Sequence, residues 1–209
     1  TDVRAIAEKH KISEELAGRN VRYEAFEKYS NGGLIATAHS LSDNIETVLF
    51  YFARGTSLHG MGGIPPVRGR IIRPLIMCTS AEIRQYCRDM SLPYVTDSTN
   101  SDNDMTRNLI RNEILPLFSE INPSFEKSAG GSIENLRIAG DYADKLACDL
   151  IKRAEIKDGY DAAVMKDADI SVLSRAFSML ISEKFGISPQ KKHIDALCSL
   201  CGNPFSYQI

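Results

Sequence analysis

A short apolar run followed by an amphipathic helix constrains the fold of this chain more than any other feature. Residues Leu34–Ala38 form a nearly unbroken apolar run, and such runs suit a parallel strand that is covered on both faces. Apolar residues then recur at helical spacing, at Ile45, Val48, Leu49 and Phe52. A strand, a tight turn and a helix make half of a βαβ unit, so the sequence predicts an open α/β sheet.

Three polar side chains lie where the predicted strand ends. His39 follows the strand directly, and Asp43 and Glu46 fall in the first turns of the helix. Ligands of open α/β sheets bind beyond the carboxyl ends of strands, and the i, i+3 spacing places both carboxylates on one helix face. This group could hold an ammonium ion, bind Mg²⁺ or remove a proton. It could equally be a helix start that favours acidic residues beside a hydrogen-bonded turn histidine.

A second polar cluster lies further along the chain. Arg107 and Arg111 are spaced i, i+4, so both guanidinium groups project from one helix face, where they suit phosphate or carboxylate recognition. The loop 96–104 before them is dense in polar residues and could close over a site; they include Asp97, Asn100, Asp102 and Asp104. The alternative is a solvated basic face paired with those acids.

The remaining elements define the domain organisation. Residues 71–76 and 92–95 are two further extended segments, and Thr79–Glu82 is a capping box that opens a helix to about Met90. The dipeptide Asn122-Pro123 is a boundary signal, and helical periodicity dominates after it. We therefore expect residues 1–122 to form an α/β domain and residues 123–209 to form an all-helical domain.

Composition excludes several protein classes. The net charge of -2 gives no overall basic footprint for nucleic acid, although the local group Arg68, Arg70 and Arg73 could contact an RNA backbone or be an exposed loop. The apolar runs are too short to span a bilayer. The five cysteines are an odd number, which favours reduced thiols in the cytoplasm, and the Cys198–Cys201 pair fits helix packing better than metal binding.

Several blocks of the sequence occur together in a specific order between about residues 2 and 123. They are Arg19 with Arg22-Tyr23, Ala36–His39 with Asp43 and Glu46-Thr47, Ala53–Pro66, Ile72–Leu75, Asp97–Asn100, and Thr106–Arg111. In this combination they resemble the tRNA(Ile)-lysidine synthetases, which belong to the N-type ATP pyrophosphatases with a PP-loop. Residues 124–209 are compatible with this family but carry no comparably sharp motif.

The resemblance implies an incomplete Rossmann-like sheet of the adenine nucleotide alpha hydrolase type. It implies a cytoplasmic ligase that joins free L-lysine to C2 of the wobble cytidine of a tRNA(Ile) with a CAU anticodon, forming lysidine. ATP, with Mg²⁺, adenylates the C2 oxygen and releases pyrophosphate; the lysine ε-amine then attacks C2 and AMP leaves. No membrane is involved, and a homodimer is allowed.

The resemblance also suggests roles for individual residues. Free lysine has a side-chain pKa of roughly 10.4, so Asp43 and Glu46 would grip its ammonium group and assist deprotonation. His39 would shape the site or contact the reacting nucleotide, and Arg107 and Arg111 would stabilise phosphate charge or orient substrate. No metal ligand is implied. Substrate binding is expected of three more residues: Asn44, Arg54 and Asn108.

The chain departs from the family pattern in two respects. Ser40 stands where the family often has a second histidine, and Asn44 stands where it often has glutamine. The family's ATP loop, Ser-Gly-Gly-x-Asp-Ser, is not found, because no Gly-Gly pair of this chain follows a strand and opens a helix. We therefore expect the family's protein to extend beyond this chain at both ends. The chain alone should bind ATP poorly and should not catalyse the reaction.

Other functions compete with this interpretation. A PP-loop tRNA thiolation enzyme is one alternative, but Cys78 and Cys87 do not form a paired motif. A catalytically inactive tRNA-binding scaffold is a second alternative. A metal-dependent hydrolase built on His39, Asp43 and Glu46 is a third.

Overall fold

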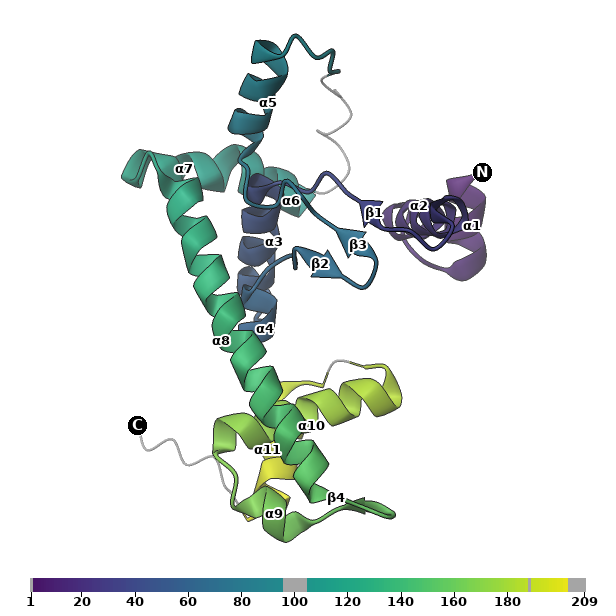
Figure 1. Ribbon diagram of the computed structural model, residues 1–209, viewed down its shortest axis with the longest axis vertical. Coiled ribbons are helices and arrows are strands. Elements are labelled where there is room, and N and C mark those ends of the chain that lie inside the picture. Colours follow the sequence, from purple (N-terminus) through teal and green to yellow (C-terminus); the bar gives the residue numbers. More distant parts are fainter. Residues whose placement is uncertain (1, 96–104, 188, 203–209) are drawn as a thin grey trace. The chain divides into compact units, whose positions relative to one another are not determined.

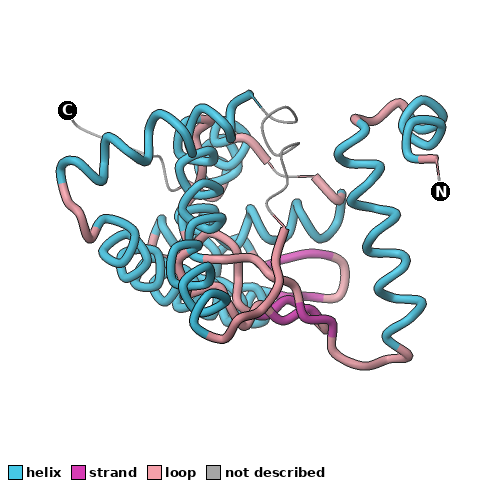
Figure 2. Tube along the Cα trace, turned by 90° about the horizontal axis from the view of Figure 1, so that it is seen from above, coloured by secondary structure: helices cyan, strands magenta, loops and turns pink. Residues whose placement is uncertain are grey.

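The structure, a computed structural model, describes residues 2–95, 105–187 and 189–202. The polar loop 96–104, with Asp97, Asn100, Asp102 and Asp104, lies outside the described residues. Two compact units make up the chain, unit 1 at Thr1–Glu134 and unit 2 at Asn135–Ile209. Helices dominate both units, and the strands are short segments between them (Figures 1 and 2).

Unit 1 begins with two helices, continues through a small sheet, and ends in helices. Its elements are α1 (Val3–His10), α2 (Glu14–Ser30), β1 (Ile35–Ala36), α3 (Leu41–Ala53), α4 (Leu58–Met61), β2 (Val67–Arg68), β3 (Ile71–Ile72), α5 (Ser80–Asp89), α6 (Met105–Leu109), the π-helix η2 (Ile110–Ile114), α7 (Leu115–Ile121) and the first turns of α8 (Phe125–Ala154). The predicted strand–turn–helix is therefore confirmed as β1 and α3.

The sheet of unit 1 has the order β1-β3-β2 and is mixed. Strands β1 and β3 pair in parallel, with Ile35 opposite Ile71, whereas β2 and β3 form an antiparallel hairpin. The parallel pairing expected of an open α/β sheet is therefore present between β1 and β3, and an antiparallel hairpin adds to it. The hairpin turns at Gly69, whose φ of 59° lies in the left-handed region that glycine adopts without steric cost.

The predicted extended segments are shorter in the structure than in the sequence pattern. Strand β1 is covered on one face only, because Ile35 is buried and Ala36 is exposed. Strand β3 ends at Ile72, before Pro74, which has no N–H to donate to a ladder. Residues 92–95 form no strand, and Leu92 donates its N–H to the Cys87 carbonyl at the end of α5.

The core of unit 1 forms around α3. Leu41, Ile45 and Val48 of α3 are buried against residues of η2, α7 and α8, namely Ile110, Leu115 and Ile133. The predicted apolar stripe is correct for Ile45 and Val48 but wrong for Phe52, which is 68% exposed. Helix α3 is therefore fixed in unit 1 through its first half, the part that follows β1 and carries the acidic residues.

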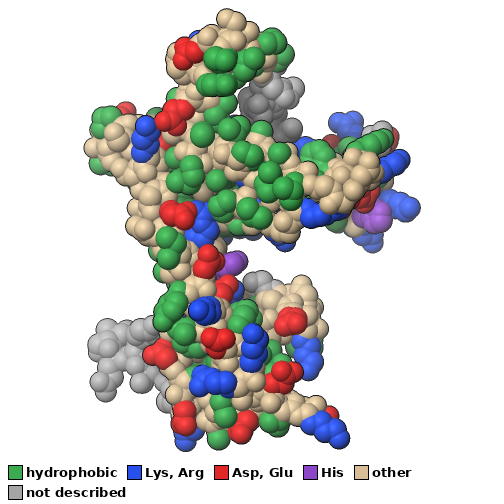
Figure 3. Space-filling model, in the orientation of Figure 1, with side chains coloured by type: hydrophobic (Ala, Val, Ile, Leu, Met, Phe, Trp, Pro, Cys, Tyr) green, Lys and Arg blue, Asp and Glu red, His purple; other side chains and the backbone are tan. Residues whose placement is uncertain are grey.

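Unit 2 has a separate core and one feature that helical periodicity missed. It contains the rest of α8, β4 (Glu155–Ile156), β5 (Gly159–Tyr160), α9 (Ala162–Lys166), α10 (Ile170–Phe185) and α11 (Lys191–Leu200). The antiparallel pairing of β4 and β5 means that this region is not all helical. Lys157 and Asp158 connect the two strands, and Asp and Gly residues are common in turns. Acidic and basic side chains are interspersed on its visible face (Figure 3).

The cysteine pair and the predicted domain boundary can also be placed. Cys198 is fully buried in the core of unit 2 and Cys201 packs against that core, and burial raises the pKa of the Cys198 thiol to about 11. The packing interpretation of this pair is therefore confirmed. Asn122 lies between α7 and α8, while the two units divide later, within α8.

A buried amide holds the segment that follows α4 against α3. Asn44 Oδ1 accepts a hydrogen bond of 2.6 Å from the Ile64 N–H. Gly63 has a φ of 66°, and a Cβ atom there would lie 2.2 Å from Asn44 Oδ1 and 2.9 Å from Val48 Cγ2. Only a residue without a side chain can bring the backbone this close to α3.

The substitution Gly63→Ala should lower the free energy of unfolding by about 1–3 kcal/mol. It places a side chain at a positive φ, which strains the backbone, and the added Cβ clashes with Asn44. Chemical denaturation measures the change. Gly131→Ala is the matched control, since Gly131 lies in α8 with open space around it and alanine favours helices. Equal stability of the two variants would contradict this account of Gly63.

Candidate active site

The first turn of α3 is fixed by a capping box. Ser40 accepts a hydrogen bond from the Asp43 N–H at 3.3 Å, and Asp43 Oδ2 accepts from the Ser40 N–H at 2.8 Å and from the Ser40 hydroxyl at 2.7 Å. The helix-capping interpretation of Asp43 is therefore correct. It leaves Oδ1 of the same carboxylate uninvolved in the cap, with the Asp43 side chain 38% exposed.

Glu46 differs from Asp43 in being buried and paired. Its side chain is only 6% exposed, and its two oxygens accept hydrogen bonds from Arg111 Nε at 2.7 Å and Arg111 Nη2 at 2.9 Å. Hydrogen bonding to Glu46 is the main cause that raises the pKa of Arg111 above its usual value. Such a two-point guanidinium–carboxylate pair fixes orientation as well as charge, so it joins α3 to η2.

Arg111 also approaches the second carboxylate. Its Nη2 lies 3.7 Å from Asp43 Oδ1, so one guanidinium group faces both acids. The structure thus brings together Asp43, Glu46 and Arg111, which the sequence had placed in two separate clusters. Arg111 lies in η2, a π-helix, and π-helical turns are rare and frequent at functional sites.

His39 lies between charges of both signs. Its Nδ1 is 2.9 Å from the Thr37 hydroxyl, so the turn interpretation holds for one ring nitrogen. Burial is the first cause that lowers the pKa of His39; Arg73 is the second, Asp43 opposes them, and Arg19 and Arg107 add smaller lowering effects. These effects favour the neutral imidazole, which can accept a proton or a hydrogen bond.

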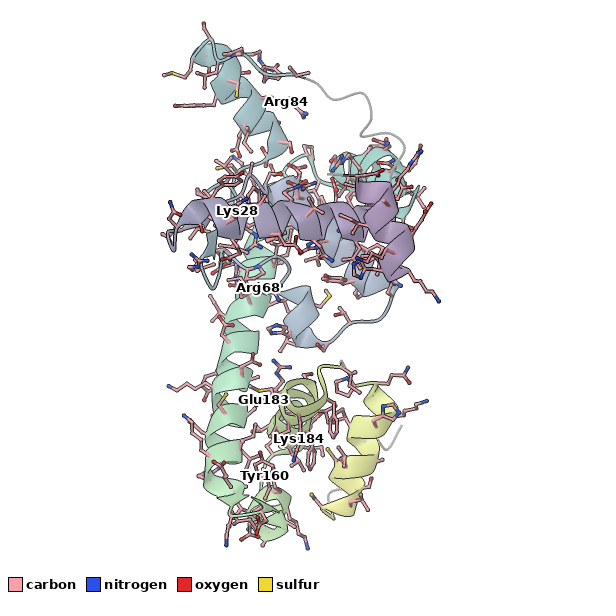
Figure 4. All side chains as sticks on the ribbon, turned by 90° about the vertical axis from the view of Figure 1, so that its right-hand side faces the viewer. Lys28, Arg68, Arg84, Tyr160, Glu183 and Lys184 are labelled. Carbon is pink, nitrogen blue, oxygen red and sulfur yellow. The ribbon has the colours of Figure 1, made fainter. Side chains whose placement is uncertain are left out.

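Arg73 is the residue near this group that sequence reasoning assigned wrongly. It was grouped with Arg68 and Arg70 as a basic patch, but Arg73 is buried, with 6% exposure, and its Nη1 donates to the Pro65 carbonyl at 2.7 Å. Arg70 pairs with Glu27, and Arg68 is exposed on β2 (labelled in Figure 4). A charged residue inside the apolar run at 71–76 was the available signal for burial.

The three residues expected to bind substrate lie in different surroundings. Asn44 is 1% exposed, and its amide oxygen is used to hold Ile64. Arg54 is at the C-terminal end of α3, about 16 Å along the helix axis from Asp43 at 1.5 Å per residue, and its guanidinium lies over the Phe50 ring. Asn108 is half-buried on α6, next to Arg107. The substrate contacts of all three stay predictions.

Metal binding and membrane insertion can be assessed for the described part of the chain. Within it there is no group of three or more His, Cys, Asp or Glu side chains that could hold a metal ion. The acids of the site are committed instead to Arg111 and to the cap of α3. None of the helices described is long and apolar enough to cross a membrane.

This site, on a helix that follows a parallel strand, is consistent with a nucleotide-binding α/β fold, and comparison with known families agrees. Residues 1–118 match the PP-loop domain. That match covers more than half of the chain, so the chain belongs to the PP-loop family.

Several curated relatives share one name. A protein of Thermosipho africanus named tRNA(Ile)-lysidine synthase is 39% identical over 201 residues, covering 94% of this chain and 46% of the relative. Its namesake from Clostridium acetobutylicum is 35% identical, covering 100% of this chain and 47% of the relative. Another, from Caldanaerobacter subterraneus, is 47% identical over 119 residues, 56% of this chain and 26% of that protein. The chain spans about half the length of the first two relatives.

The capping box gives a direct test of how α3 is positioned. Ser40→Ala should lower the free energy of unfolding by about 1 kcal/mol, because the Asp43 N–H loses its acceptor at the helix start. Thermal or chemical denaturation measures the loss. Ser57→Ala is the control, since Ser57 precedes α4 without a side-chain capping bond. A Ser40 variant no less stable than the Ser57 variant would show that the cap contributes nothing.

Proposed function

We propose that this chain is part of an ATP-dependent ligase that joins lysine to C2 of the wobble cytidine of a CAU-anticodon tRNA(Ile). The observation that carries the proposal is the pair of carboxylates of Asp43 and Glu46, gathered on one cation after a parallel strand of a PP-loop domain. The relatives named tRNA(Ile)-lysidine synthase support the choice of reaction.

The proposed reaction has two steps. The C2 oxygen of the cytidine attacks the α-phosphorus of ATP, and pyrophosphate leaves. The lysine ε-amine then forms the C2–N bond while the C2–O bond to the adenylate breaks and AMP departs. Between these steps the ε-ammonium must lose a proton, since its pKa of roughly 10.4 keeps it charged at neutral pH. Free L-lysine, ATP and tRNA(Ile) are the reactants, in the cytoplasm.

In this proposal each residue of the site has a distinct task. Asp43 and Glu46 receive the ε-ammonium and favour its position before deprotonation. Neutral His39 contacts the reacting nucleotide or accepts a proton. Arg107, whose charge reaches His39, stabilises the phosphate that becomes part of the adenylate.

The proposal leaves part of the machinery outside these residues. The chain contains no Ser-Gly-Gly-x-Asp-Ser run, so binding of the ATP phosphates is assigned to a segment beyond it, and the 209 residues alone should be inactive. No described residues are assigned to Mg²⁺. A homodimer is compatible with the proposal and is not required by it.

Isosteric loss of either charge should disable the ligase. In the full-length protein that carries this chain, Asp43→Asn and Glu46→Gln should each lower kcat/KM for lysine at least about 100-fold, as removal of acid–base groups typically does. Lysidine formation on a tRNA(Ile) transcript is the measurement. Glu113→Gln, at an exposed acid of η2, is the control. Full activity in both site variants would refute the proposal.

A further inference from the structure

The pairing of Glu46 with Arg111 conflicts with a site that is ready to receive lysine. Both oxygens of Glu46 are already used by the guanidinium group. We propose that Arg111 is a placeholder, whose guanidinium occupies the position of the substrate ammonium until it is displaced. This inference rests on the proposed function. It adds that Arg111 and the substrate lysine compete for Glu46, and that this competition controls when lysine binds.

The exposures of the two partners decide which of them moves. Glu46 is 6% exposed, whereas Arg111 is 43% exposed. A buried carboxylate that loses its paired cation is strongly disfavoured unless another cation replaces it. Arg111 can instead move its charged end into solvent. Glu46 therefore stays, and Arg111 is exchanged for an incoming ammonium group.

The acceptors around Arg111 match an ammonium group in number. A lysine ammonium has three N–H donors and no acceptor. Among the residues that the structure describes, three oxygens face the guanidinium: both carboxylate oxygens of Glu46 and Asp43 Oδ1 at 3.7 Å. The other oxygen of Asp43 is held by Ser40, which keeps Oδ1 directed to the site.

The helix that carries Arg111 provides a way to release it. Residues Ile110–Ile114 form a π-helix between α6 and α7. Its i→i+5 hydrogen bonds accommodate one extra residue in this turn compared with an α-helix. If the extra residue shifted to the other side of Arg111, that side chain would rotate by about 100°, one residue step of an α-helix. Ile110 is buried and would anchor the segment as it shifts.

The exchange has a consequence for the order of substrates. A guanidinium group released from Glu46 is suited to a phosphate, which it can bind through two N–H groups. The anionic adenylate of the activated tRNA would therefore favour the released position of Arg111. Lysine would then compete for Glu46 more effectively after activation, when there is an electrophile for the amine to attack.

Removal of the placeholder should strengthen lysine binding. We expect Arg111→Met to bind L-lysine at least tenfold more tightly than the unchanged chain in calorimetric titration without ATP, and Glu46→Gln/Arg111→Met to lose the gain. L-Norleucine, which lacks the ε-amine, is the ligand control and should not gain affinity. Equal or weaker lysine binding by Arg111→Met would overturn the placeholder.

A measurement on the unchanged chain covers the case in which Arg111→Met fails to fold. The ¹⁵N-detected Nε–H signal of Arg111, assigned by its loss in Arg111→Lys, should be protected from solvent exchange and lose protection as L-lysine is added. Protection that persists at saturating lysine would overturn the placeholder. That result would not contradict the proposed function, because the proposed function is tested by the lysidine-forming activity of Glu46→Gln and does not require Arg111 to leave.

Discussion

The hydrogen-bonded pair of Glu46 and Arg111 is the interaction on which the arrangement of the site depends. It joins a helix that follows the parallel strand β1 to a π-helix 65 residues further along the chain. A carboxylate with 6% exposure requires a cation, so the pair fixes the distance between α3 and η2 at this point. Asp43 is then positioned from two sides, by the cap of α3 and by the same guanidinium group.

This arrangement places two neighbouring environments side by side, one negatively charged and one positively charged. The carboxylates of Asp43 and Glu46 favour a cation, whereas burial together with Arg73, Arg19 and Arg107 lowers the pKa of His39. The proposed reaction would use both environments, because the lysine ammonium, before it loses its proton, and the adenylate carry opposite charges. His39 is influenced by Asp43 as well as by the arginines, so it lies at the boundary between the two.

The sequence predicted the parts of this structure that depend on local chemistry. The strand and helix around His39, and the capping box at Thr79–Glu82, follow from side-chain spacing and from hydrogen bonds within a few residues. The Glu46–Arg111 pair could not be predicted in this way, since no local rule aligns residues this far apart. The π-helix and the burial of Arg73 also depend on packing between elements. Phe52 was misplaced because α3 extends beyond the surface that buries its first half.

A double-mutant cycle tests the central claim, that Glu46 and Arg111 act as one unit. The unfolding free energies of the unchanged chain, Glu46→Gln, Arg111→Met and the double variant give the coupling between the two side chains. We expect a coupling of about 1–3 kcal/mol, within the range for residues in direct contact. Additivity within about 0.5 kcal/mol, as for independent sites, would contradict the claim.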